Sequence, residues 1–587
     1  MTGSFPPSLF MILGALLVPF LKGKTRNWYT ILLPAAAFCL IWQLETGASW
    51  HLHFFDHKLT LLRVDKLSKV FGYIFTLNAF AAFVYAFYLK DSSQHIAAII
   101  YIGSSLGVVF AGDLISLYLF WEVMAVASTF LILARKSKKA IDAGMRYILV
   151  HIAGGLCLLA GIFVYISQTG SIEFSAMSDP DWGSYLILIG FLVNAAAPPL
   201  SAWLPDAYPE ATVTGGVILS AYTTKTAVYT LVRGFPGWEI LIWVGCIMTI
   251  YGIIYALLEN DMRRILAYSI INQVGFMITG VGIGTMISLN GTVAHAFCHI
   301  IYKALLWMSA GSVLYMTGKS RCTDLGGLYK TMPWTLIFGA VGALSISSFP
   351  GTSGFTSKSL IIDGAVHAHL MWVWLVLEIA SAGVFLHAGI KFPYFVFFAK
   401  DKGLRPGESN MSMLLAMGFM SFLCIFLGVY PQPLYALLPY EVHYQAYTFN
   451  HVVAQLQLLM FSALVFFLFL PLLKRTETVS IDTDWFYRKG GRLFFHVMDR
   501  TLNKINRVCE RVFVGGITGF LARISKDVVP RFILLGMVSF WVLTGSRGEV
   551  LEMKKTNLYN DFLRGTLPVG IGAGVAGLFI ILLFVLS

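Results

Sequence analysis

Long apolar runs follow one another along most of the chain, separated by short polar loops. The early runs cover about residues 4–21, 28–44, 67–89, 95–111, 113–134 and 145–167. A helix needs about 20 mostly apolar residues to cross a bilayer, and these runs lack the apolar–polar alternation of barrel strands. The pattern predicts an all-α polytopic membrane protein with roughly 15–17 transmembrane helices.

Two of the later runs are interrupted. The run that starts at about residue 185 meets Pro198 and Pro199, and a run after Pro333 meets the sequence Phe-Pro-Gly at 349–351. Proline breaks a helix because it lacks a backbone donor, and a break at membrane depth is tolerated only where it lines protein or a wet cavity. Two interrupted segments in the two halves of a chain are typical of inverted-repeat transporters with a midplane site.

The remaining runs complete the predicted architecture. They cover about residues 213–233, 239–258, 265–283, 291–316, 371–398, 412–430, 453–473 and 567–586. Residues 475–530 are charged and amphipathic, which predicts one or two helices on the membrane surface or on a neighbour, and the apolar run at 532–543 is short for a span. We divide the chain into N-terminal transmembrane helices (1–110), a first repeat (111–260), a second repeat (261–430) and a C-terminal part with further helices, the amphipathic surface segment and a last span (431–587).

Composition agrees with a membrane protein and excludes several other classes. Charged residues make up 12% of the chain, against about 25% in soluble domains. The net charge of +12 comes from short basic loops, which is the positive-inside pattern and not a nucleic-acid surface. It predicts a multi-pass protein of the inner (cytoplasmic) membrane with its N-terminus outside. The seven cysteines are scattered without a CxxC pair, so neither a disulfide framework nor an iron–sulfur cluster is expected, and we predict no cofactor.

The run at 291–316 carries three basic side chains, His295, His299 and Lys303, at spacing i, i+4, i+8. At about 100° per residue they share one stripe of a helix. A lysine at membrane depth costs about 2.5–3.5 kcal/mol on insertion scales, so packing alone does not account for it. The stripe indicates a proton or ion path. The alternative is that the histidines only satisfy buried carbonyls.

The two histidines also stand at the spacing of a zinc pair on a helix. A third ligand is not evident in the sequence and the surroundings are apolar, so we predict no metal site.

Other ionisable residues lie inside apolar runs and extend the candidate path. Glu122 has no basic residue at i±3 or i±4, so its partner must come from another helix. Buried groups of opposite charge shift one another's proton affinity, which lets a proton pass if water connects them. The alternative is a static ion pair between helices, and a lysine near a span end could also snorkel. The further members are Lys225 and Lys358, with Glu378, His387 and Lys391 as secondary candidates.

Five motifs, in this order along the chain, resemble the antiporter-like subunits found in respiratory complex I, in Mrp-type Na+/H+ antiporters and in membrane-bound hydrogenases. They are FWE at 120–122, WLPDAYPEA at 203–211, ENDMRRILAYSIINQVG at 259–275, HAFCHIIYKALLWMSAG at 295–311 and FPGTSGFTSK at 349–358. The resemblance covers roughly residues 60–430. It is strongest to the antiporter D-type and hydrogenase-associated members, through the sequences TTKTAVYTLVRGFPG and EIASAGVFLHAGIKFPYFVFF.

The resemblance implies two inverted five-helix repeats, each with a broken helix, and a row of charged residues across the membrane centre. The positions that match the family's path residues are Glu122, Lys225, Lys303 and Lys358. One position departs, because the family's usual lysine in the first broken helix is Asn194 here. Asparagine either caps free backbone groups at the break or marks an altered first half-channel. We then expect Glu122 to pair with Lys225 or an ordered water.

Three functions follow from these features. The leading interpretation is a proton-translocating antiporter-like subunit, coupled to Na+, in a multisubunit membrane complex. The second is an ion-pumping membrane-arm subunit of a hydrogenase or an NADH-dehydrogenase-like redox complex, in which this chain performs no catalytic chemistry because it has no cofactor ligands. The third is a non-conducting structural subunit, for which Asn194 is the hint. The expected partners are other membrane subunits, H+ and Na+, and the lipid bilayer, with no nucleic acid.

Overall fold

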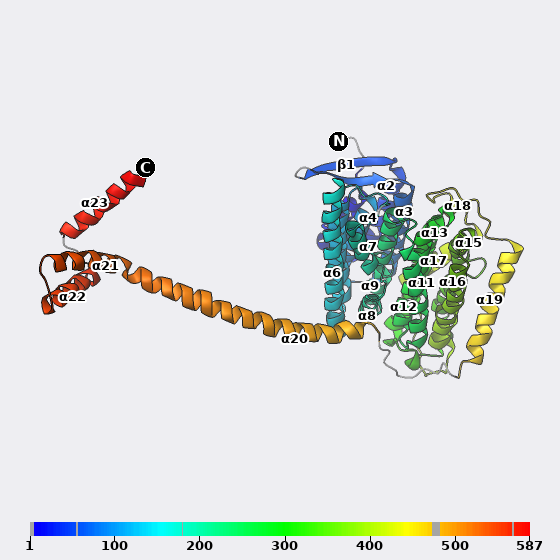
Figure 1. Ribbon diagram of the computed structural model, residues 1–587. Helices are drawn as coiled ribbons and strands as arrows, with labels where there is room; N and C mark the ends of the chain where they lie inside the picture. The colour runs from blue at the N-terminus through cyan, green and yellow to red at the C-terminus, as the bar shows by residue number, and fades with distance from the viewer. Residues whose placement is uncertain (1–4, 55–56, 179, 472–481, 566–568, 587) are drawn as a thin grey trace. The chain divides into compact units, whose positions relative to one another are not determined.

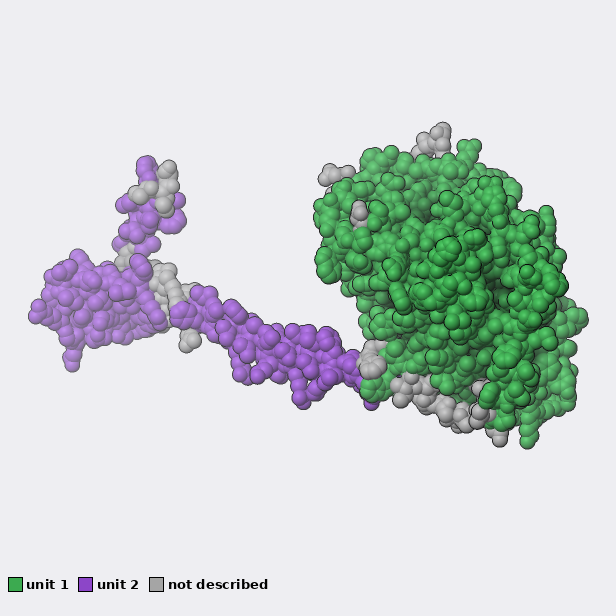
Figure 2. Space-filling model, turned by 45° about the vertical axis from the view of Figure 1, so that its right-hand side comes forward, with its two compact units in different colours: residues 1–485 green, residues 486–587 purple. Residues whose placement is uncertain are grey.

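The computed structural model describes residues 5–54, 57–178, 180–471, 482–565 and 569–586. It divides into two compact units, residues 1–485 and residues 486–587 (Figure 2). In the first unit the helices stand side by side as a bundle, with a β-hairpin across one end (Figure 1). The described part of the second unit is mostly helical.

The first unit contains helices α1 to α19. The N-terminal half comprises α1 Pro7–Ala15, α2 Gly23–Gln43, α3 Lys66–Tyr85, α4 Ser92–Phe110, α5 Leu114–Leu133, α6 Lys138–Thr169, α7 Trp182–Asn194, α8 Trp203–Ala207, α9 Val213–Leu219 and α10 Thr223–Gly234. The other half comprises α11 Ile240–Leu258, α12 Met262–Ile283, α13 Met286–Thr317, α14 Pro333–Ile346, α15 Ser353–His367, α16 Met371–Val384, the π-helical turns Phe385–Lys391 and Tyr394–Phe398, α17 Met411–Val429, α18 Gln432–Tyr435 and α19 Phe449–Leu468.

Within the described ranges, ten helices are long and apolar enough to cross a membrane unbroken. The predicted 15–17 also counted shorter apolar helices, such as Trp182–Asn194 and Pro333–Ile346, which stop at breaks before they reach span length. Large apolar side chains on the outer face of α6, such as Leu149 and Phe163, are exposed, as expected where a helix faces lipid. The prediction of a mostly helical polytopic membrane protein is therefore confirmed, with fewer unbroken spans.

Both predicted interruptions are present. Helix α7 ends at Asn194 before the two prolines, and α14 ends at Ile346 before the Phe-Pro-Gly sequence. Each break contains a non-glycine residue in the left-handed region, Ala196 at φ 62° and Ser348 at φ 59°. Such residues cost about 1–2 kcal/mol and persist only where their surroundings fix them. The two breaks therefore share a backbone feature as well as their proline.

The structure also contains an interruption that the sequence did not predict. The apolar run at 213–233 is divided between α9 and α10, and residues 220–222 separate them. These residues are Ser-Ala-Tyr, which carry neither the proline nor the glycine that marks the other breaks. Lys225 lies in the first turn of α10, next to this break.

A β-hairpin precedes α3, with strands β1 Gly47–Phe54 and β2 His57–Val64 paired in antiparallel register from Gly47↔Val64 to Phe54↔His57. Leu59, Leu62 and Val64 of β2 are buried against the bundle. Thr60 N donates to Asp113 Oδ2 (2.6 Å), which attaches the hairpin to the start of α5. The all-α prediction did not include this hairpin, because its strands are short and form no long apolar run.

A buried carboxylate, that of Asp482, lies just before the first C-terminal helix. Asp482, which is 4% exposed, accepts a hydrogen bond from Tyr268 OH of α12 (2.5 Å) and another from Tyr251 OH of α11. Helix α20, Asp484–Cys509, follows directly, then the π-helical segment Glu510–Ile517, α21 Thr518–Leu543, α22 Glu549–Leu563 and α23 Val569–Leu586. Helix α20 is amphipathic, as predicted for this region, and α23 matches the predicted last span.

Candidate functional site

Helix α13 carries the candidate stripe through the middle of the bundle. Its start is fixed by Thr285, whose side chain accepts from Ser288 N, and it continues for 32 residues to a left-handed Gly318. His295, His299 and Lys303 are all 0% exposed. The predicted stripe therefore faces protein and not lipid, which is the condition under which ionisable residues at membrane depth become functional candidates.

His295 is held by side chains from two neighbouring helices. Its Nε2 lies 3.0 Å from Gln273 Oε1 on α12, and its Nδ1 lies 3.2 Å from Ser357 Oγ on α15. Tyr302 OH donates to the same Gln273 oxygen (3.1 Å). The partners of His295 are therefore side-chain groups, an amide oxygen and a hydroxyl, and not backbone carbonyls. Gln273, Tyr302 and Ser357 lie within the recognised motifs, but neutral polar residues were not counted as path members.

His299 and Lys303 are both fully buried. Among the residues that the structure describes, neither ring nitrogen of His299 nor Lys303 Nζ has a hydrogen-bond partner. The charges of Lys225, Lys303 and Lys358 all act electrostatically on His299. Buried polar atoms of this kind are where proteins bind ordered water. We refer to Lys225, His295, His299, Lys303 and Lys358 together as the central cluster.

The two remaining lysines of the central cluster each lie at a helix break. Lys225 Nζ donates to Ser220 O (2.7 Å) and to Thr224 Oγ1 (3.1 Å). Lys358 Nζ donates to Ile346 O (3.1 Å), the last helical carbonyl before the second break, and lies 5.1 Å from the ring centre of Phe276. An interrupted helix leaves carbonyl groups free, and these groups attract a cation. The breaks thus position the ammonium groups.

Glu122 lies apart from the central cluster, at the edge of the bundle. Its side chain is half-buried beside an apolar groove of about 560 Å³ between α4 and α5. Within the described chain its buried Oε1 has no hydrogen-bond partner. The expected pair with Lys225 is wrong, because Lys225 bonds Ser220 and Thr224 instead. The carboxylate packs against Gly155 of α6, where an added Cβ would lie 2.0 Å from Oε1.

Asn194 does not cap the break, contrary to the simpler expectation. Its Oδ1 lies 2.7 Å from Nδ1 of His151 on α6, and both side chains are buried. The carbonyl of Val193 next to it is satisfied by Trp203 Nε1 (2.9 Å). Sequence reasoning missed His151, which stands alone in an apolar run and lies 43 positions from its partner.

The secondary candidates have different surroundings. Glu378 is half-buried on α16 and interacts electrostatically with Lys358. His387 Nδ1 lies 2.8 Å from Gly383 O. Lys391 is fully buried and donates to three carbonyls at the end of α11, those of residues 256, 257 and 259, at 2.6, 2.7 and 2.8 Å. The alternative that Lys391 snorkels to the surface is therefore wrong, because its ammonium group caps a helix inside the protein.

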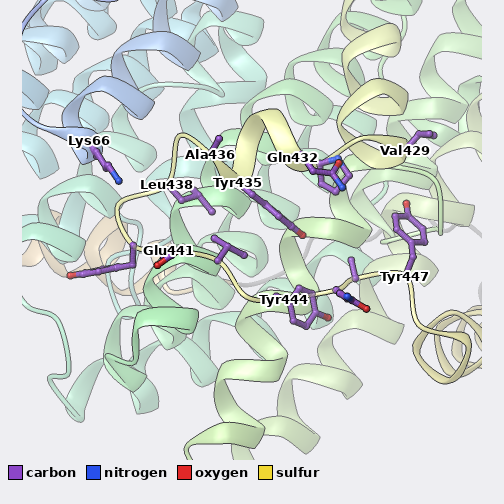
Figure 3. Close-up of a pocket in the computed structure, with 14 residues that line it drawn as sticks. Lys66, Val429, Gln432, Tyr435, Ala436, Leu438, Glu441, Tyr444 and Tyr447 are labelled. Atoms are coloured by element: carbon purple, nitrogen blue, oxygen red, sulfur yellow. The ribbon is translucent and has the colours of Figure 1, made fainter.

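A polar cavity of about 770 Å³ adjoins the second break. Figure 3 shows the segment after α17 along the cavity, with Tyr435 at the end of α18, Tyr444 and Tyr447 in the loop that follows, and Lys66 at the start of α3. Tyr435 OH donates to Thr356 O (2.6 Å), and Tyr447 OH accepts from Gly351 N (3.1 Å). Two tyrosines that line the cavity therefore bond the backbone of the second break and of α15.

Polar and titratable side chains follow one another from α15 to α13 inside the bundle. Ser357 of α15 contacts His295, and His295 shares Gln273 with Tyr302. His299 and Lys303 continue one and two turns further along α13. Imidazole and amine groups that exchange protons near neutral pH can pass a proton along such a row when water fills the gaps.

A protein-family model matches residues 111–384, and its description reads NADH:quinone oxidoreductase/Mrp antiporter, transmembrane. Hydrogenase-4 component B of Escherichia coli is 26% identical over 438 residues, covering 66% of this chain and 65% of the relative. Na(+)/H(+) antiporter subunit A1 of Staphylococcus haemolyticus is 27% identical over 493 residues, covering 72% and 60%. The chain thus spans less than two thirds of the length of these two relatives.

The fold is similar to that of a chain in the solved structure of a membrane-bound sulfane sulfur reductase (MBS), an archaeal respiratory membrane complex. The TM-score is 0.72 at 23% identity, with 89% of this chain and 99% of that chain covered. The matched residues 111–384 include all five members of the central cluster. Residues 111–384 are thus similar to the antiporter-like family that Mrp antiporters, complex I subunits and hydrogenase components share.

Proposed function

We propose that this chain translocates protons across the membrane, coupled to Na+, as the antiporter-like subunit of a multisubunit complex. The observation that carries the proposal is the central cluster, in which five fully or almost fully buried basic groups from α10, α13 and α15 act on one another inside the bundle. Burying a charge without a partner costs several kcal/mol. A purely structural bundle would use apolar side chains there. The similarity to an Na(+)/H(+) antiporter subunit supports the coupling to Na+.

The two predicted repeats, 111–260 and 261–430, would each supply one half of the path. The support is the matching backbone of the breaks at Ala196 and Ser348, each with a left-handed residue, and a lysine that bonds a break carbonyl in each half, Lys225 at 220–222 and Lys358 at the second break. In an inner membrane with the N-terminus outside, the polar cavity beside Lys66 would open to the outer face. A cysteine scan of the loops at 22–26 and 430–448, with a membrane-impermeant reagent in intact cells, tests this orientation.

Neutralising single lysines of the central cluster tests conduction. The whole complex carrying Lys225→Met or Lys303→Met is placed in vesicles, and the pH change driven by a Na+ pulse is recorded. We expect transport to fall by at least about tenfold, as for the loss of a proton-transfer group. Lys319→Met, in the exposed loop after α13, is the matched control and retains transport. If both cluster variants transport normally, the chain is a non-conducting structural subunit and the proposal is wrong.

A second candidate is the ion-pumping subunit of a redox complex, favoured by the similarity to a hydrogenase component and by the fold shared with a respiratory complex. In this case the chain still moves protons through the central cluster, but electron transfer in partner subunits drives the movement. Purifying the tagged chain and identifying its companions separates the two candidates. Cluster-binding or hydrogenase subunits support the second, and small antiporter subunits alone support the first.

A further inference from the structure

One buried histidine lies outside the central cluster and beside Glu122. His151, on α6, is 1% exposed. Its Nδ1 lies 2.7 Å from Asn194 Oδ1, and within the described part of the chain its Nε2 has no hydrogen-bond partner. With an amide oxygen as neighbour, Nδ1 carries the proton and Nε2 presents a lone pair. The hydrogen bond at Nδ1 therefore orients the imidazole, and Nε2 is able to accept a proton.

Helix α6 brings this imidazole close to the Glu122 carboxylate. Gly155 lies four residues after His151, so both face the same side of α6, about 6 Å apart along the helix axis. The Glu122 Oε1 packs directly on Gly155, since a Cβ at that position would lie 2.0 Å from it. The carboxylate and the imidazole are thus about one helical turn apart, which is the size of gap that one or two water molecules span in proteins.

On the side away from Glu122, the neighbours of His151 lie near Lys225 of the central cluster. Tyr147 lies four residues before it, with the two ring centres 4.1 Å apart. The Tyr147 hydroxyl lies 2.9 Å from Ser128 Oγ and also interacts with the Thr223 side chain. Thr223 begins α10, two residues before Lys225. Tyr147, His151 and Gly155 therefore form a stripe on α6, spaced like the stripe on α13, that runs between Glu122 and Lys225.

We propose that His151, oriented by Asn194, is the proton relay of the first half of the chain and passes protons between Glu122 and Lys225. In one direction the O–H bond of the Glu122 carboxylic acid breaks and an N–H bond forms at His151 Nε2. The imidazolium then releases that proton through the Tyr147 side to the neutral amine of Lys225, which becomes an ammonium. Each step moves one proton and leaves its donor ready to be refilled. This inference rests on the proposed function.

A structural histidine, held between Tyr147 and Trp203, is the competing explanation. His151→Gln separates the two, because the amide keeps a hydrogen bond to Asn194 but cannot carry a proton. The matched control is His95→Gln on α4, a histidine 1% exposed that contacts the backbone carbonyl of Leu89. Adding Asn194→Lys to the His151→Gln variant places an amine beside the altered residue and restores a proton carrier.

The measurement is Na+-driven pH change in vesicles that contain the whole complex, expressed per amount of assembled complex. We expect His151→Gln to lower transport by at least about tenfold, as for a lost acid–base group. We expect His95→Gln to leave transport within about twofold of the wild type, and the double variant to recover most of it. If the glutamine variant assembles poorly, His151→Asn replaces it with the same readout.

The outcomes separate the inference from the function on which it rests. Normal transport in His151→Gln, with transport lost in Lys303→Met, overturns the relay and keeps the proposed function. Normal transport in both variants overturns the proposed function. If His151→Gln loses transport and the added Asn194→Lys does not restore it, His151 has a structural role. This outcome also overturns the relay.

Discussion

The imidazole Nε2 of His295 lies 3.0 Å from the side-chain oxygen of Gln273, and this contact joins α13 and α12, the two most enclosed of the ten long apolar helices that the structure describes. The same oxygen accepts a hydrogen bond from Tyr302 OH. A neutral amide thereby fixes the orientation of a titratable ring without competing for its proton. The central cluster depends on such neutral groups as much as on its charges.

Gln273→Leu removes this shared oxygen. His295 and Tyr302 then lose a buried partner, which costs about 1–3 kcal/mol for each unsatisfied group. We expect a complex that assembles with lowered thermal stability and at least about tenfold slower proton transport. The control is Thr279→Val, also buried on α12, whose hydroxyl donates to Gly275 O of its own helix (2.9 Å) and contacts Cys246 Sγ on α11 (3.9 Å). Transport equal to the control would show that the amide has no role in the path.

Gly155→Ala moves the Glu122 carboxylate without changing its chemistry. The new Cβ would lie 2.0 Å from Oε1, so the carboxylate must shift away from α6. Alanine in a helix is favoured over glycine by about 0.5–1 kcal/mol, so we expect normal assembly but reduced transport. Gly490→Ala on α20, with no atom of the described chain within 4 Å of the added Cβ, is the control. Unchanged transport would show that transport does not depend on where the Glu122 carboxylate lies.

The polar cavity beside the second break gives an accessibility prediction. In a background where the exposed Cys39 and Cys509 are replaced by serine, Gln445→Cys places a thiol in the cavity wall. We expect a bulky, impermeant maleimide to react with it from one membrane face and to block transport. Lys319→Cys, in an exposed loop, should react without any effect on transport. Full transport after complete labelling of Gln445→Cys would mean that protons do not pass through the cavity.

Asp65 and Arg233 give a pH dependence. Burial alone would raise the pKa of Asp65, but the charge of Arg233 at 2.7 Å, together with the hydrogen bond from Ser68 N, lowers the pKa below its ordinary 3.8. Because the folded-state pKa is depressed, the stabilisation is complete above about pH 3.8 and is lost as the pH falls through the lower folded value. Asp65→Asn keeps the helix cap and removes the charge.

We therefore expect the melting temperature of Asp65→Asn to lie below that of the wild type near neutral pH, and the difference to shrink as the pH falls below about 3.8. Thermal unfolding in detergent across this range measures it. The exposed Asp142→Asn on α6 serves as the control for a general loss of negative charge. A difference that grows toward acid pH would contradict the stated direction of the shift.

Asp482 fixes the start of α20, so its removal should loosen that helix end. Asp482→Ala leaves the hydroxyls of Tyr251 and Tyr268 without their acceptor, and hydrogen bonds to a charged group are worth about 1.5–3 kcal/mol each. We expect backbone amides just after residue 482 to exchange hydrogen at least about tenfold faster in mass spectrometry. The exposed Asp499→Ala, later on α20, should leave their exchange unchanged. Equal exchange in both variants would show that the carboxylate does not hold the helix.

Features with a local sequence signal were predicted correctly. Proline and glycine mark the breaks at Pro198-Pro199 and 349–351, and apolar length marks most helices. The break at residues 220–222 has no such signal, because its free carbonyl is satisfied by the Lys225 side chain in the folded bundle. Short strands such as β1 and β2 carry little hydropathy signal beside the long runs around them.

Partnerships between helices were not predictable in the same way. Spacing placed His295, His299 and Lys303 on one face because a single helix fixes their relation. Glu122 and Lys225 lie on different helices, and the sequence does not tell how far apart their side chains are, so the expected pair was wrong. The bond between His151 and Asn194 joins residues 43 positions apart, and only the folded packing of α6 on α7 reveals it.

The cap that Lys391 forms on α11 bears on how far the proposed proton path extends. An ammonium group has three N–H donors, and here each has a backbone carbonyl at 2.6–2.8 Å. Only the protonated amine supplies all three bonds, so this residue acts as a stationary cation instead of a carrier. His387, four residues earlier, lies in the electrostatic field of both Lys303 and Lys391. If protons move along the proposed path, Lys391 therefore holds a fixed positive charge at the end of α11 and does not carry one of them.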